Sequence, residues 1–233
     1  MSPDAQAILA HLGSVADERQ RQAADPLLAQ RVRAVKAYQH RRFEIAYADL
    51  LRDPGTRDAA LFFLSDLYGA HDFSARDAQF GRIVPTLDRV FTREIVRTVR
   101  DLAELHALSE RMDHRMAVVL RGPTLDPKGY VDAWCAVGEP ALRERQIVLM
   151  LGVGGALVGY TRSRWLRHSL RLMRAPARAA GLDALHGFLE RGFDTFAALR
   201  EPQAFLDTLA TRERALAALL FTRPVPPPEV LPS

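Results

Sequence analysis

The sequence predicts an all-α protein, a single-domain mixed bundle of about eight helices. The strong helix formers Ala (35), Leu (32) and Arg (30) far outnumber the strand formers Val (16), Ile (5) and Thr (10). Apolar residues recur at helical spacing along most of the chain, and Pro and Gly separate the periodic segments. The length of 233 residues fits one domain. We therefore expect one helical domain over residues 1–223 and a loose, Pro-rich tail over residues 224–233.

The expected helices begin or end at residues that favour those positions. Ser2 is placed to cap a short first helix with Pro3 at its first position, and Asp25 is placed to cap a long second helix. Pro85 predicts a kink or a break near Arg82 in the fourth helix. In chain order the expected helices cover residues 3–12, 26–52, 56–68, 74–91, 93–121, 128–137, 139–174, 182–199 and 202–221.

Two segments are expected near the centre of the bundle. The helix over 56–68 is apolar on nearly every side, which is typical of a buried helix. The apolar run from Ile147 to Tyr160 has 14 residues, whereas about 20 are needed to cross a bilayer. We therefore expect a buried helix there and no transmembrane segment. The single Cys135 excludes an internal disulfide, and the N-terminal residues lack a secretory pattern, which together favour the cytoplasm.

One stretch of the chain resembles a known family. It runs Leu-Phe-Phe-Leu-Ser-Asp-Leu-Tyr-Gly over residues 61–69 and continues with Asp72-Phe73, Arg76-Asp77 and residues 82–85. This pattern is similar to one in an uncharacterised, all-helical family of proteobacterial proteins. The family has no assigned activity. The resemblance therefore implies the fold class and a bacterial cytoplasmic origin, and it implies no catalytic residue.

The charge pattern gives the main functional hypothesis. No acidic residue occurs from Arg145 to Leu182, and within that stretch arginines recur at steps of three and four residues. Such steps place side chains on one face of a helix, so we expect a ridge formed by Arg164, Arg167, Arg171 and Arg174, with Arg178 beyond it. The ridge favours an acidic protein partner or an anionic ligand, which includes a phosphate-bearing small molecule or an acidic lipid. The alternative is that carboxylates of the same chain neutralise it. Nucleic acid is disfavoured because only Trp165 could stack on bases there.

A cluster of glycines gives a second candidate. Gly152, Gly155 and Gly159 fall on one face of a predicted helix, although each costs up to about 1 kcal/mol relative to Ala in a helix interior. Their spacing favours the close approach of another helix. The alternative is a crevice for a small molecule beside residues 152–159, which would make the protein a sensor.

The third candidate is a ladder of polar side chains. His106, Glu110 and His114 follow each other at helical spacing, and His186 lies on a later helix. Carboxylate and imidazole groups on facing helices can hold a metal ion in a bundle. We therefore keep a metal- or haem-binding protein, with an oxidoreductase activity included, as the alternative to ordinary pairs at i and i+4.

The sequence as a whole favours a non-enzymatic cytoplasmic protein that works by association and needs no cofactor. Its arginine face would bind the acidic partner or the anionic ligand. The identity of that partner and the oligomeric state, a homodimer included, are left open by the sequence.

Overall fold

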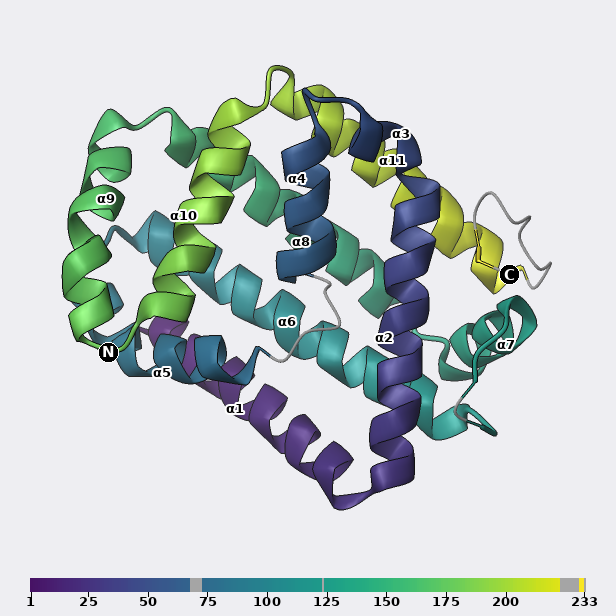
Figure 1. Ribbon diagram of the computed structural model, residues 1–233. Coiled ribbons are helices and arrows are strands. Elements are labelled where there is room, and N and C mark those ends of the chain that lie inside the picture. The colour runs from purple at the N-terminus through teal and green to yellow at the C-terminus, as the bar shows by residue number, and fades with distance from the viewer. Residues whose placement is uncertain (68–72, 123, 223–230, 233) are drawn as a thin grey trace.

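The computed structural model describes residues 1–67, 73–122, 124–222 and 231–232, and it is an all-α single domain, as predicted (Figure 1). The described part of the chain forms eleven α-helices and one π-helical segment, η1. Their bounds are α1 Pro3–Ala24, α2 Pro26–Ala46, α3 Ala48–Arg52, α4 Arg57–Phe62, η1 Phe63–Leu67, α5 Ser74–Val90, α6 Arg93–Val119, α7 Pro127–Val137, α8 Pro140–Thr161, α9 Arg164–Ala179, α10 Asp183–Ala198 and α11 Pro202–Phe221.

The predicted caps of the first two helices are confirmed, but the predicted end of the first helix is wrong. The Ser2 hydroxyl accepts a hydrogen bond from the amide of Ala5, and the Asp25 carboxylate accepts from the amides of Leu27 and Leu28. These bonds satisfy amides that have no partner within a helix. Helix α1 does not end near residue 12. It continues to Ala24 because its buried face continues along α6.

Two helices predicted as continuous are each broken in two. The predicted helix over 26–52 breaks at Tyr47, where the Arg212 guanidinium donates to the carbonyl oxygen of Ala46. The predicted helix over 139–174 breaks after Thr161. The Ser163 hydroxyl accepts from the amide of Leu166 at 3.3 Å and so caps the new helix α9. The longest helix is therefore α6, with 27 residues.

Two other boundaries also differ from the prediction. Helix α5 runs over Pro85 without a break, so the break considered near Arg82 does not occur. The helix predicted over 56–68 is α-helical only to Phe62 and continues as η1. Its predicted end at residues 68 and 69 lies outside the described residues.

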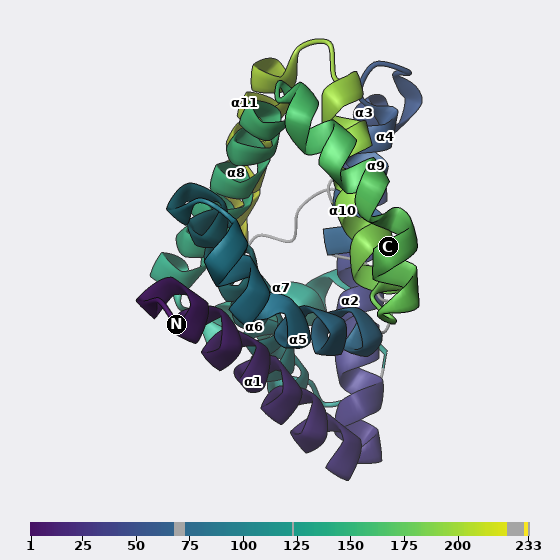
Figure 2. The ribbon, with the colours of Figure 1, turned by 90° about the vertical axis from the view of Figure 1, so that its left-hand side faces the viewer.

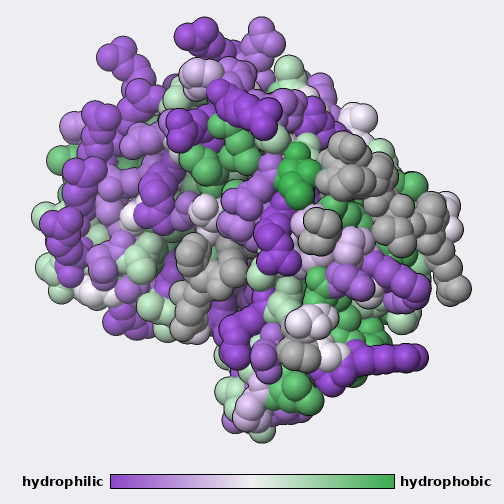
Figure 3. All heavy atoms as spheres, turned by 45° about the vertical axis from the view of Figure 1, so that its right-hand side comes forward, coloured by the Kyte–Doolittle hydropathy of each residue, from purple (hydrophilic) through white to green (hydrophobic). Residues whose placement is uncertain are grey.

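Helices α6 and α8 pack against each other and cross the middle of the view in Figure 1. In Figure 2 α8 lies at one side of the molecule, and the helix expected to be buried over residues 147–160 is buried on one face only. Helices α1 and α5 pack together beside α6, and α11 packs on α8. Helix α4 lies against α10, and its Phe62, with Phe63 and Leu64 of η1, belongs to the central hydrophobic cluster. The expected central position of this apolar segment is confirmed. On the face in Figure 3 hydrophilic residues predominate, and hydrophobic residues are visible in separate patches.

The C-terminal residues that the structure describes are packed against the domain. Leu231 is completely buried in the hydrophobic cluster formed by α2, α6, α7 and α11. The Tyr38 hydroxyl donates to the carbonyl oxygen of Pro232 at 3.0 Å. Residues 231 and 232 therefore do not form a loose tail, because hydrophobic burial and a buried hydrogen bond hold them in place. The other residues of the predicted tail, 224–230 and 233, lie outside the described part.

The glycine prediction is wrong in its choice of residues. Gly152, Gly155 and Gly159 are exposed, and a Cβ atom at any of them would have no neighbouring atom within 4 Å. The close approach of another helix occurs instead at Gly154, where a Cβ atom would lie 2.7 Å from Leu206 of α11. The three predicted glycines point away from the core because α8 packs there through Val153 and Gly154.

Alanine substitutions at two of these glycines should have opposite effects on stability. Gly152→Ala should raise the free energy of unfolding by about 0.5–1 kcal/mol because it improves helix propensity at an open position. Gly154→Ala should leave the protein about 1–3 kcal/mol less stable than Gly152→Ala because of overpacking against Leu206. Urea denaturation of both variants measures the difference. Equal stability of the two would contradict the packing described here.

Candidate functional site

Helix α9 lies at one edge of the molecule and is covered only on one side. It packs against α10 and, more weakly, against α8 (Figures 1 and 2). Ala177 is its one buried residue, and Leu166 and Leu170 are half-buried. The predicted arginines of the helix are all exposed. The expectation of an outward-facing arginine ridge therefore agrees with the structure.

The five arginines of α9 differ in their partners. Arg174 is paired with Glu190 of α10, with Nη2 and Oε1 2.9 Å apart. The Arg167 guanidinium lies over the ring of Phe193, 5.6 Å from the ring centroid. The guanidinium groups of Arg164, Arg171 and Arg178 make no ion pair or hydrogen bond with any described residue. Among the residues that the structure describes, a carboxylate neutralises an arginine of α9 only at Arg174.

Helix α9 also exposes large apolar residues. Trp165 is 67% exposed, Leu172 63% and Met173 53%. Scattered single hydrophobic residues are normal on a protein surface. Here three of them share one helix with the unpaired arginines, so α9 offers both apolar and cationic groups to the outside.

The four predicted metal ligands do not form one site. His106 contacts Asp77 of α5, and Glu110 contacts Lys36 of α2, with Nζ and Oε1 2.6 Å apart. His114 and His186 take further partners, Glu18 of α1 and Glu190 of α10. Within the described residues, no group of three or more His, Cys, Asp or Glu side chains is placed to hold a metal ion. Three of these residues pair with other helices, whereas His186 pairs with Glu190 one turn along its own helix α10.

His106 belongs to a network of charged groups instead. Its Nε2 atom lies 2.8 Å from Asp77 Oδ2, and Arg19 of α1 lies 3.0 Å from the same oxygen. Burial alone would raise the pKa of Asp77, but the hydrogen bond from His106 and the nearby charges of His106, Arg76 and Arg19 lower this pKa to about 2. Asp77, Arg76 and Asp66, which carry the family resemblance, border a cavity of about 80 Å³ whose other walls are mostly apolar.

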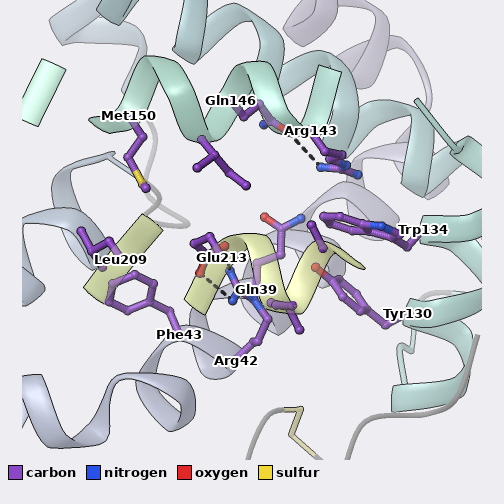
Figure 4. A pocket seen from close by; sticks show the side chains of 13 residues that line it. Gln39, Arg42, Phe43, Tyr130, Trp134, Arg143, Gln146, Met150, Leu209 and Glu213 are labelled. Atoms are coloured by element: carbon purple, nitrogen blue, oxygen red, sulfur yellow. Dashed lines mark hydrogen bonds and ion pairs between the residues drawn. The ribbon is translucent and has the colours of Figure 1, made fainter. Parts of the chain in front are cut away.

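Another cavity, of about 70 Å³, lies between α2, α7, α8 and α11 (Figure 4). Tyr130, Trp134 and Arg143 line one end of it, and Phe43, Met150 and Leu209 line the other. The Arg143 guanidinium lies 3.7 Å from the centroid of the Trp134 ring and donates to the Gln146 side chain. This cavity therefore has a polar end and an apolar end.

The polar lining of this cavity is only partly paired. Arg42 is paired with Glu213, whose carboxylate also accepts from the Tyr47 hydroxyl at 2.8 Å. The indole N–H of Trp134 and the Nε atom of Arg42 are buried and have no hydrogen-bond partner among the described residues. Buried donors are normally paired with protein or with water, so these two unpaired atoms are exceptions in the wall of the cavity.

This cavity was not predicted from the sequence. Glu213 of α11 lines it, and four further polar residues come as pairs from two distant helices, Gln39 and Arg42 from α2 and Arg143 and Gln146 from α8. Within each helix the two residues are three positions apart, on the side that also carries the apolar contacts. Polar residues repeated within an apolar face were the available signal. Only the tertiary packing shows that the two pairs face one cavity.

Asp113 of α6 lies close to the polar end of this cavity. Its carboxylate accepts a hydrogen bond from Gln39 at 3.0 Å. Burial raises the pKa of Asp113 to about 6, and the negative charge of Glu110 acts in the same direction. The positive charges of Lys36 and Arg143 lower the pKa but do not cancel the effect of burial. The folded protein therefore holds this proton more tightly than the unfolded chain, in which the pKa is 3.8.

This difference predicts a pH-dependent effect of Asp113→Asn. The contribution of Asp113 to stability is fully present below pH 3.8 and is lost as the pH rises through about 6. An asparagine keeps the acceptor for Gln39 and carries no charge. The difference in free energy of unfolding between the variant and the original protein should therefore shift in favour of the variant by about 2 kcal/mol as the pH rises from about 4 to about 7. Urea denaturation at both pH values measures this gain. A difference that does not change with pH would contradict the raised pKa.

Comparison with known proteins identifies one family. The family described as a domain of unknown function (DUF8198) matches residues 18–227, which is most of the chain. No curated protein and no solved structure matches the chain. In the described part of the chain, no helix is both long enough and apolar enough to span a membrane.

Proposed function

We propose that this chain, which belongs to the family of the domain of unknown function DUF8198, is a non-enzymatic protein of the bacterial cytoplasm that works by association. The exposed arginines of α9 bind the negative groups of an acidic partner or an anionic ligand. The association requires no cofactor. An uncharacterised family was expected from the sequence, and the family match confirms that much.

One observation carries this proposal. Arg164, Arg171 and Arg178 are exposed on one helix, and none has a carboxylate partner among the described residues. Guanidinium groups form paired hydrogen bonds with carboxylates and phosphates, so unpaired ones on a common face favour an anion. Arg174 contributes less because Glu190 already neutralises it. Exposed charges attract a partner over about one Debye length, so the association weakens as the salt concentration rises.

Charge reversal on α9 tests the proposal. Arg167→Glu combined with Arg171→Glu should lower the affinity for a fluorescent poly-glutamate peptide at least about tenfold, because attraction becomes repulsion. Both residues are exposed, so the circular dichroism spectrum should stay helical. Fluorescence anisotropy at low and high salt measures the binding.

A matched control separates the α9 ridge from net charge. Arg52→Glu combined with Arg57→Glu changes the net charge by the same amount at exposed positions of α3 and α4. This control should bind the peptide nearly as well as the original protein. Equal losses in the two variants, or no loss on reversal of the α9 arginines, would contradict the proposal.

A second candidate function is the binding of a small molecule, and the buried indole N–H of Trp134 favours it. The sequence placed such a pocket beside Gly152–Gly159, but those glycines face open space. The cavity between α2, α7, α8 and α11 is the better place, because it joins unpaired donors to an apolar wall. These features suit a short-chain carboxylate.

Tryptophan fluorescence tests the second candidate. The chain has two tryptophans, so Trp165→Phe leaves Trp134 as the only one. Propionate should then change the emission with a saturating dose response, because its carboxylate accepts from the Trp134 indole. Arg42→Gln, which alters the polar lining of the cavity, should weaken the response. A response that grows linearly and equals that of free tryptophan would contradict binding in the cavity.

A further inference from the structure

We propose that the partner of α9 is the surface of an anionic membrane. The helix lies flat among the lipid headgroups, Trp165 and Leu172 enter the acyl region, and the arginines contact lipid phosphates. This inference rests on the proposed function, because it uses the same arginines and names the class of anion that they bind.

The distribution of side chains around α9 supports this arrangement. Residues seven apart in a helix differ in direction by only about 20°, so Trp165 and Leu172 project from the same side. The arginines from Arg164 to Arg178 project within an arc of about 80° on another side. The third side, with Ala177 buried and Leu166 half-buried, faces α10. The outward half of the helix thus carries a cationic strip from Arg164 to Arg178 and, beside its first half, an apolar strip formed by Trp165 and Leu172.

This division suits a membrane surface better than an acidic protein segment. Helices that lie in the interface combine arginine or lysine on one face with Trp, Phe or Leu on another. Trp is enriched at the boundary between headgroups and acyl chains. An acidic segment would pair with Arg164, Arg167 and Arg171 but would leave Trp165 and Leu172 in water.

The charges around α9 are compatible with an anionic surface. The sequence from Arg145 to Leu182 contains no Asp or Glu. Two acidic groups of the packed helix α10, Glu190 and Asp194, act on Arg174. No described carboxylate pairs with Arg164, Arg167 or Arg171, so this segment keeps its positive charge toward a membrane.

Co-sedimentation with vesicles tests the inference. The original protein should sediment with vesicles of phosphatidylcholine and phosphatidylglycerol in equal parts and should stay in solution with phosphatidylcholine alone. Two double variants separate the contributions of the strips. One combines Arg164→Gln with Arg171→Gln in the cationic strip, and the other combines Trp165→Ala with Leu172→Ala in the apolar strip. Each should lower the partition coefficient at least about tenfold. A control, Val118→Ala with Val119→Ala, removes exposed apolar groups from α6 and should have no effect.

The possible results distinguish this inference from the proposed function. Sedimentation that depends on both strips supports both. Binding to poly-glutamate without binding to the anionic vesicles overturns the membrane inference and leaves the proposed function standing. Binding to neither overturns both. Vesicle binding that the loss of Trp165 and Leu172 leaves unchanged overturns the insertion of the apolar strip, because charge alone would then account for it.

Discussion

The turn at Arg162 and Ser163 is the constraint on which the functional surface depends. It ends α8 inside the bundle and starts α9 outside it, with the Ser163 hydroxyl capping the new helix. Had the helix continued, the arginine ridge would have extended along the axis of α8. Because the chain turns, α9 runs back along α10, and α10 covers only one side of it. Exposure of both the arginines and Trp165 follows from this change of direction.

The sequence predicted local features well and tertiary relations poorly. The caps at Ser2 and Asp25 were predicted because the residue and its neighbours determine them. The break at Ser163 had the same kind of signal, a serine before a new periodic segment, but the long apolar run concealed it. The choice between Gly152 and Gly154 could not be made from spacing alone, since it depends on where Leu206 of another helix lies.

The polar ladder of α6 shows the same limit for a functional site. His106 and Glu110 are one turn apart, and this spacing suggested a shared ligand. In the fold, α5 supplies Asp77 to one of them and α2 supplies Lys36 to the other. The charges that complement His106 and Glu110 come from residues far away in the sequence, so ion pairs form where the metal site was predicted. The arginine ridge was predictable because a single helix determines it.

The bare glycines of α8 also influence how α9 is attached. Gly152, Gly155 and Gly159 leave the backbone of the last turns of α8 open to water, and glycine makes a helix easier to unwind. The hydrogen bond between Tyr160 and Thr98 of α6 is a fixed point at this end. Leu157 and Val158 of the same turns pack against the central hydrophobic cluster, so the support for the start of α9 comes from side-chain packing rather than from helix propensity.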